Sequence, residues 1–255
     1  MAHLQVQGLH KTFDGITAVN DLSFDVRRNE ICAIIGPNGA GKTTTFNLLS
    51  GVLPADRGKI FFDGNEILGL PPHDIARRGM VRTFQTVSLF DSMTVLDNVK
   101  VGCHGKAGAG LFSAALRTPG LRREEKEITK KALEALKLLG VADRACDQAG
   151  SLPFGQQRLV DIARALASDP EMILLDEPAA GLNAHETTGL ASLILALKNR
   201  GLTVMIIEHD MELIMEIADS IVVLDQGMKI ACGPPAAIQK DPRVIAAYLG
   251  DEDEN

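Results

Sequence analysis

The sequence has 255 residues, of which 45% are hydrophobic, so the chain can form one large domain or two small ones. Its 26 basic and 33 acidic residues give a net charge of −7, which argues against a nucleic-acid-binding surface, since such a surface needs a basic stripe. No apolar run approaches the roughly 20 residues that span a bilayer, and the N-terminus lacks the pattern of a secretion signal. Four scattered cysteines without a C-x-x-C pair predict free thiols rather than a zinc site.

The N-terminal segment predicts three strands. Residues 4–9 and 22–26 alternate apolar and polar side chains, as half-buried strands do, and we expect them in an antiparallel sheet beside the main core. Residues 10–15 between them are predicted to form a turn that carries one aromatic residue, Phe13. The apolar run at 31–35 predicts a short buried strand.

A glycine-rich turn follows this strand and has the spacing G-x-x-x-x-G-K-[ST]. Glycines let the backbone approach a ligand closely, and the N–H groups of such a turn form an anion-binding nest at a helix N-terminus. Lys42 would contact the β- and γ-phosphates, and the Thr43 hydroxyl would contact Mg²⁺. The helix behind the turn is predicted to end at Gly51. The motif therefore predicts a nucleoside triphosphate site rather than an ordinary glycine-rich turn. The residues predicted to bind it are Gly36, Pro37, Asn38, Gly39, Ala40, Gly41, Lys42, Thr43 and Thr44.

Three short elements lead to a glutamine. Residues 58–62 predict a strand, residues 71–79 a short helix and residues 81–84 a strand that delivers Gln85. An amide at this position could contact both Mg²⁺ and an attacking water. The alternative is a glutamine on a surface loop.

Helices replace strands after Gln85. Residues 94–101 and 124–139 are predicted to be helical, and an apolar stripe with helical period marks a further helix around 159–166. Residues 102–123 have no clear period, so we expect a loop with at most one short helix. The pattern predicts a helical subdomain over residues 86–165, inserted into an α/β core.

The α/β pattern then resumes. Apolar strands are predicted at 172–175 and 204–207, helices at 185–199 and 211–218, and a hairpin over 221–231. Continuous apolar strands that alternate with helices predict a parallel sheet covered by helices on both faces.

Polar residues follow two of these strands at the sheet edge where α/β folds bind ligands. Asp176 could hold Mg²⁺ or instead cap the next helix, and Glu177 could act as a general base on water. His209 could donate to a γ-phosphate, although a lone histidine is more often structural. Phe13 could stack on adenine or belong to a small satellite core. The absence of an N-K-x-D segment weakly favours ATP over GTP.

Residues 151–157, Ser-Leu-Pro-Phe-Gly-Gln-Gln, resemble the L-S-G-G-Q signature of ABC ATPases. Together with the motifs above, in their order and spacing, the resemblance covers essentially the whole chain. It is strongest to the ATP-binding subunits of branched-chain amino acid importers. The segments that carry it are residues 177–183, 207–211 and 247–250.

The resemblance implies an α/β P-loop NTPase of 255 residues that forms one ABC ATPase domain. Residues 1–85 and 166–233 would form the RecA-like nucleotide-binding core with an antiparallel β-subdomain. Residues 86–165 would form the α-helical signature subdomain, and residues 234–255 a C-terminal extension with an acidic tail. The implied cofactors are ATP and Mg²⁺.

The resemblance also assigns roles. Glu177, His209 and Gln85 would act in catalysis, while Thr43, Gln85 and Asp176 would hold Mg²⁺. The signature residues would contact a nucleotide bound to a second ATPase subunit, because ABC ATPases pair head to tail. These signature residues are Leu152, Pro153, Phe154, Gly155 and Gln156.

The implied assembly contains this chain, a second ATPase subunit, two transmembrane permease subunits and, indirectly, a periplasmic substrate-binding protein, with the ATPases on the cytoplasmic face of the inner membrane. Pro153 and Phe154 stand where the signature usually has serine and glycine, and Asn183 stands where aspartate is usual. Proline offers neither a hydroxyl nor a backbone N–H, so we expect a weakened signature and a different partner chain with an intact one.

Three alternatives remain open from the sequence. The first is a soluble ABC ATPase of DNA repair or translation, although no coiled-coil insertion or tandem domain is present. The second is an ABC ATPase for another cargo, such as urea or lipopolysaccharide. The third is a regulatory module without turnover, which would not need Glu177.

Overall fold

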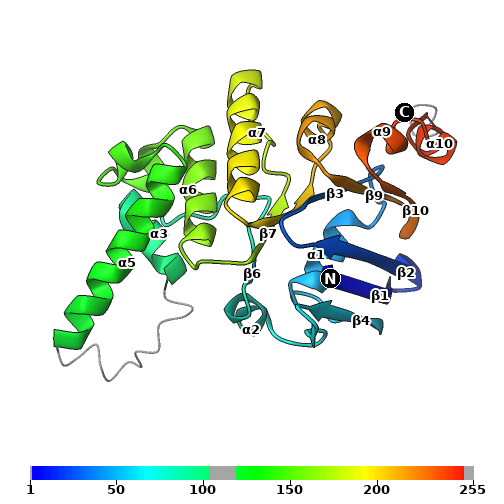
Figure 1. Ribbon diagram of the computed structural model, residues 1–255, viewed down its shortest axis with the longest axis horizontal. Coiled ribbons are helices and arrows are strands. Elements are labelled where there is room, and N and C mark those ends of the chain that lie inside the picture. Colours follow the sequence, from blue (N-terminus) through cyan, green and yellow to red (C-terminus); the bar gives the residue numbers. More distant parts are fainter. Residues whose placement is uncertain (1, 104–118, 250–255) are drawn as a thin grey trace.

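The computed structural model describes residues 2–103 and 119–249, and Figure 1 gives its arrangement. The strands are β1 (Ala2–Phe13), β2 (Ile16–Arg27), β3 (Ile31–Ile35), β4 (Arg57–Phe62), β5 (Asn65–Glu66), β6 (Met80–Arg82), β7 (Met172–Asp176), β8 (Thr203–Ile207), β9 (Ser220–Asp225) and β10 (Met228–Gly233). The described helices are α1 (Lys42–Leu49), α2 (Pro72–Arg77), α3 (Val95–Cys103), α5 (Pro119–Leu138), α6 (Phe154–Leu166), α7 (Ala184–Asn199), α8 (Met211–Ile217), α9 (Pro235–Ile238) and α10 (Pro242–Leu249), and the 3-10 helices are η2 (Ala142–Arg144) and η3 (Ala149–Ser151).

The larger sheet is mostly parallel and has the order β10-β9-β3-β8-β7-β6. Strands β9, β3, β8, β7 and β6 run parallel to one another, and β10 returns antiparallel to β9. Every residue of β3, β7 and β8 is buried, because side chains on both faces of the sheet are covered. The predicted parallel α/β core is therefore confirmed.

Alternate residues of β3 point into two different cores. Ile31, Ala33 and Ile35 pack in a cluster with α6, α7 and α8, whereas Cys32 and Ile34 pack in a second cluster with α1 and strands of the smaller sheet. Figure 1 shows α7 and α8 on one side of the larger sheet, with the smaller sheet on the other. This placement fixes α1 between the two sheets.

The smaller sheet has the order β2-β1-β4-β5 and is antiparallel, as predicted. The turn predicted over residues 10–15 is wrong in extent, because β1 continues to Phe13, which pairs with Ile16. Register shifts between Leu9 and Lys11 and between Lys11 and Thr12 carry the pairing beyond the alternating stretch. Bulges of this kind hide a strand from period-2 analysis.

Helices α3, α5 and α6 pack against one another at the β6 side of the sheet (Figure 1). Helix α5 begins at Pro119, whereas the sequence predicted a loop with at most one short helix up to residue 123. Proline is favoured in the first turn of a helix, but Gly120 is a poor helix former and conceals the start. The predicted strand 81–84 is shifted, since β6 ends at Arg82.

Three further predictions concern segments outside the described residues, the cysteines and membrane-spanning helices. The predicted features at 104–118 and in the acidic tail from residue 251 lie outside the described residues. The cysteines are free thiols, as predicted. Within the described ranges, no helix combines the length and apolar character needed to cross a bilayer.

Candidate nucleotide site

The strand order brings distant motifs to one edge of the larger sheet. Strands β3, β8, β7 and β6 are parallel neighbours, so their carboxyl ends lie side by side. Residues 36–43 follow β3, His209 comes soon after β8, Asp176 closes β7 just before Glu177, and Gln85 follows β6. Ligands of open α/β sheets bind at this edge. Each predicted polar residue therefore reaches the same region from its own strand.

The glycine-rich loop packs tightly against backbone on its outer side. A Cβ on Gly36 would lie 2.0 Å from the Leu224 carbonyl oxygen, and a Cβ on Gly41 would lie 2.3 Å from that of Ala18. Gly41 also has a φ of 95°, which disfavours other residues. At Gly39, by contrast, an added Cβ would meet nothing within 4 Å. Backbone carbonyls thus pack against one side of the loop, while the side at Gly39 is open, as a phosphate-binding loop requires.

Lys42 lies across this loop. Its Nζ donates to the carbonyl oxygens of Gly36 at 2.6 Å and Pro37 at 2.8 Å. Helix α1 begins at Lys42, and no side-chain hydrogen bond caps its first turn, where Thr43 and Thr44 lie. Helix N-terminal N–H groups and a lysine ammonium together attract phosphate.

The two carboxylates at the end of β7 have different environments. The Asp176 side chain is 3% exposed, and its Oδ2 accepts a hydrogen bond from Arg82 Nη2 at 2.7 Å. Glu177 adopts a φ of 46°, an uncommon conformation for a residue other than glycine. Its Oε2 accepts from Gln85 Nε2 at 2.6 Å, so the fold brings two of the predicted catalytic side chains into direct contact.

His209 is mainly solvent-exposed, and sequence reasoning overlooked its neighbour Glu208. The Glu208 carboxylate is buried and accepts the backbone N–H groups of Ala179 at 2.7 Å and of His209 at 3.1 Å. Burial raises the pKa of Glu208. Its position directly after the apolar run at residues 204–207 could have identified it. This carboxylate ties the segment after Glu177 to the segment that carries His209.

Phe13 lies at the tip of the β1–β2 hairpin, and the residue is 41% exposed. Lys11 Nζ lies 5.3 Å from the ring centroid. Ala18, on the next strand of the same hairpin, contacts the loop at Gly41. An exposed aromatic face near the loop is suited to stacking on a base.

The oxygen donors at this edge fit Mg²⁺ bound together with a nucleotide. Mg²⁺ in such sites takes one or two protein oxygens and completes its shell with phosphates and water. Asp176, Thr43 and Gln85 offer a carboxylate, a hydroxyl and an amide. The described residues contain no cluster of three or more acidic, histidine or cysteine side chains, so they form no all-protein metal cage.

A family model described as "ABC transporter" matches residues 19–180, which include the glycine-rich loop and both carboxylates. The chain belongs to the ABC transporter ATP-binding family. The resemblance drawn from the motifs is therefore confirmed, and the protein is an ATPase of this family. A second family model, "Branched-chain amino acid ATP-binding cassette transporter", matches residues 228–254.

Relatives and solved structures of the ABC family align with nearly the whole chain. The high-affinity branched-chain amino acid transport ATP-binding protein LivG of Salmonella typhimurium is 47% identical, covering 97% of this chain and 98% of that protein. The corresponding protein BraF of Pseudomonas aeruginosa is 45% identical over the same shares. The ADP conformation of an ATP-binding cassette of an ABC transporter has a TM-score of 0.86 at 33% identity, covering 98% and 99% of the two chains. A dimeric post-hydrolysis cassette with ADP and Pi has a TM-score of 0.77 at 25% identity, covering 91% of this chain and 98% of that one.

The segment predicted to be the ABC signature spans the start of α6. Pro153 precedes the helix, Leu152 is buried, and Phe154 is 47% exposed. Gly155 packs closely on Glu186, since an added Cβ would lie 2.5 Å from the Glu186 Oε1 atom. Gln156 Oε1 is buried and has no recorded hydrogen-bond partner among the described residues.

Asn183, the second departure from the ABC pattern, is the N-cap of α7. Its side-chain oxygen accepts the N–H groups of His185 and Glu186, each at 3.0 Å, and Glu186 Oε2 accepts the Asn183 N–H at 3.0 Å. This reciprocal arrangement is a capping box. Asparagine therefore has a structural role within this chain.

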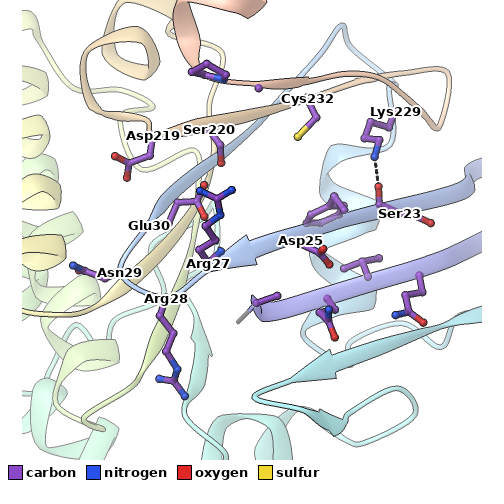
Figure 2. Close-up of a pocket in the computed structure, with 17 residues that line it drawn as sticks. Ser23, Asp25, Arg27, Arg28, Asn29, Glu30, Asp219, Ser220, Lys229 and Cys232 are labelled. Carbon is purple, nitrogen blue, oxygen red and sulfur yellow. Dashed lines mark hydrogen bonds between the residues drawn. The ribbon is translucent and has the colours of Figure 1, made fainter.

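A separate hollow of about 1390 Å³ lies between the smaller sheet and the β9–β10 hairpin (Figure 2). Its lining carries both charges, since Arg27, Arg28 and Lys229 line it together with Asp25, Glu30 and Asp219. None of the predicted site residues lines it. The predicted nucleotide-site residues therefore lie outside this hollow.

Proposed function

We propose that this chain is the ATP-hydrolysing subunit of an importer for branched-chain amino acids. The names of LivG and BraF, which align over 97% of the chain, support the cargo class. So does the branched-chain family model at residues 228–254. The observation that carries the catalytic part is the Gln85–Glu177 hydrogen bond at the sheet edge shared with the glycine-rich loop.

In this proposal, the loop N–H groups and Lys42 bind the β- and γ-phosphates, while Phe13 stacks on adenine. Thr43, Asp176 and Gln85 hold Mg²⁺, which when bound neutralises charge that develops on the phosphates. Glu177 accepts a proton from the attacking water, a step that contributes about 10²- to 10⁴-fold in rate. Gln85 orients that carboxylate.

His209 donates to the γ-phosphate. Its backbone position depends on Glu208, which also holds Ala179. Through this buried carboxylate, the segment after Glu177 and the segment of His209 keep a fixed relative position. We infer that both segments respond together when a nucleotide is bound.

The chain works with a second ATP-binding subunit, two membrane-spanning permease subunits and a substrate-binding protein, at the cytoplasmic face of the membrane. Each ATP lies between the loop of one ATPase subunit and the signature of the other. The helices of residues 86–165 contact the permeases. ATP binding favours the closed dimer, and this difference in affinity between two states drives the change in access.

Pro153 makes the two ATP sites unequal. Proline supplies neither a hydroxyl nor a backbone N–H, and Phe154 occupies the position of a glycine. The partner is therefore a different chain whose signature keeps serine and both glycines. The chain described here supplies the complete loop and the base, and its partner supplies the complete signature.

The test compares dimerisation of the Glu177→Gln variant alone and mixed with the partner subunit. Glutamine keeps an oxygen that can accept the Gln85 hydrogen bond but cannot take a proton. We expect turnover to fall by about 10²- to 10⁴-fold while ATP binding persists, and ATP-dependent dimers to form mainly in the mixture. Analytical ultracentrifugation with ATP measures this. Homodimers as tight as mixed dimers would contradict unequal sites, and unchanged turnover would contradict the role of Glu177.

A Lys42→Ala variant serves as the control. It removes the ammonium from the loop and should abolish nucleotide binding. Branched-chain amino acid uptake in membrane vesicles that contain the reconstituted complex should stop with it. Uptake at the wild-type rate would refute the assignment of the site.

A further inference from the structure

Arg82 is a buried arginine at the point where β6 ends. Its side chain is only 6% exposed, and its guanidinium fork contacts two other elements. Nη2 donates to Asp176 Oδ2 of β7 at 2.7 Å, and Nη1 donates to Asn47 Oδ1 at 2.7 Å and Ser50 Oγ at 3.0 Å. One side chain therefore joins the end of β7, the helix behind the glycine-rich loop and the strand that leads to Gln85.

Aromatic rings enclose the same guanidinium. Its central carbon lies 5.6 Å from the centroid of the Phe46 ring and 5.3 Å from that of Phe84. Stacking on aromatic rings and forked hydrogen bonding are properties of arginine that lysine lacks. The rings and the two Nη contacts together restrict Arg82 to one orientation.

The pair leaves one part of each group unused. Arg82 Nε is buried with no hydrogen-bond partner among the described residues. Asp176 Oδ1 likewise has no recorded hydrogen bond in the described part of the chain, while Oδ2 is held by Arg82. The carboxylate is thus fixed through one oxygen, and its other oxygen is available.

We propose that Arg82 is a positioning residue that orients Asp176 for Mg²⁺. This inference rests on the proposed nucleotide site. Groups that hydrogen-bond a metal-binding side chain fix its orientation, and their loss typically weakens metal binding by 10- to 100-fold. Arg82 hydrogen-bonds the carboxylate through Nη2, while its Nη1 contacts fix its position relative to the helix that carries Thr43.

The competing explanation is that Arg82 only neutralises a buried carboxylate. The chain provides a matched pair for comparison, because Asp161 on α6 is also buried and is paired with Arg164. That pair contains none of the predicted site residues. Arg82→Lys and Arg164→Lys each keep a positive charge beside a buried aspartate and remove the forked geometry.

The experiment measures binding of a fluorescent ATP analogue as Mg²⁺ is titrated. For Arg82→Lys we expect the Mg²⁺ concentration at half-saturation to rise by about 10- to 100-fold, with affinity for the analogue unchanged when Mg²⁺ is chelated by EDTA. Arg164→Lys should match the wild type in both conditions. An unchanged Mg²⁺ requirement in Arg82→Lys, or an equal loss of affinity with and without Mg²⁺, would overturn the proposal.

A second variant keeps the test decisive if Arg82→Lys does not fold. Asn47→Ala removes an anchor of Nη1 and leaves the charge pair intact, so it should raise the Mg²⁺ requirement in the same direction but less. An Asn47→Ala protein with wild-type Mg²⁺ dependence would then count against positioning. Lys42→Ala distinguishes a failure of the Arg82 proposal from a failure of the proposed function. If the wild-type chain and Lys42→Ala bound the analogue equally well, the proposed function itself would be refuted.

Discussion

The capping box at Asn183 gives a sharp prediction about stability. Asn183→Ala removes the side-chain oxygen that accepts two N–H groups of the first turn of α7. Replacing an N-cap asparagine by alanine costs about 0.5 to 2 kcal/mol. The reciprocal bond from the Asn183 backbone N–H to Glu186 Oε2 does not depend on the Asn183 side chain, so the whole of this range applies. For a chain of this size, 1 kcal/mol lowers Tm by about 2 to 4 °C.

Thermal unfolding followed by circular dichroism without nucleotide measures this effect. We expect Asn183→Ala to unfold about 1 to 8 °C below the wild type. Asn183→Asp keeps an oxygen that can accept both N–H groups and adds a negative charge near the helix N-terminus, which contributes about 0.3 to 1 kcal/mol, so its Tm should equal or exceed that of the wild type. If the alanine variant unfolds with the wild type, or if the aspartate variant loses as much as alanine, the capping argument is wrong.

Two further predictions concern buried titratable groups. Burial, reinforced by the charge of Arg28, holds the pKa of His3 below its usual range. The unfolded chain therefore binds the proton more readily than the folded chain. The free energy of unfolding should fall as the pH drops below about 6.5, by up to about 1.4 kcal/mol per pH unit, relative to a His3→Gln variant. An equal pH dependence of the free energy of unfolding in the two proteins, measured by urea titration, would contradict this. Burial raises the pKa of Cys32 to about 12, so a thiol reagent at pH 8 should modify the exposed Cys146 rapidly and Cys32 only after denaturation. Mass spectrometry that finds Cys32 modified in the native protein would refute its burial.

Local motifs are what sequence analysis identifies well. The glycine loop and its lysine are close in the chain, and their conformation depends on neighbouring residues and on the strand and helix that flank them. The carboxylates 176 and 177 were identifiable because they follow an apolar run. Asn183 and Glu186 also have the spacing of a capping box, which the sequence shows. From the sequence alone we interpret Asn183 only as a departure from the family pattern.

Contacts between distant segments were not available from the sequence. Arg82 and Asp176 are far apart in the chain, and only the adjacency of β6 and β7 brings them to 2.7 Å. Glu208 and Ala179 meet because β7 and β8 are neighbours. Sequence periodicity indicates that a strand is buried but not which strand lies beside it.

The sequence by itself therefore determined the class of ligand, the α/β core and the residues at the ends of its strands, because each depends on short-range pattern. The tertiary structure alone decided which of those residues touch. It brings Gln85 into contact with Glu177, Arg82 into contact with Asp176, and the glycine loop against Ala18. The physical reason is that strand order results from long-range packing of the whole core, so no local stretch of the sequence encodes it.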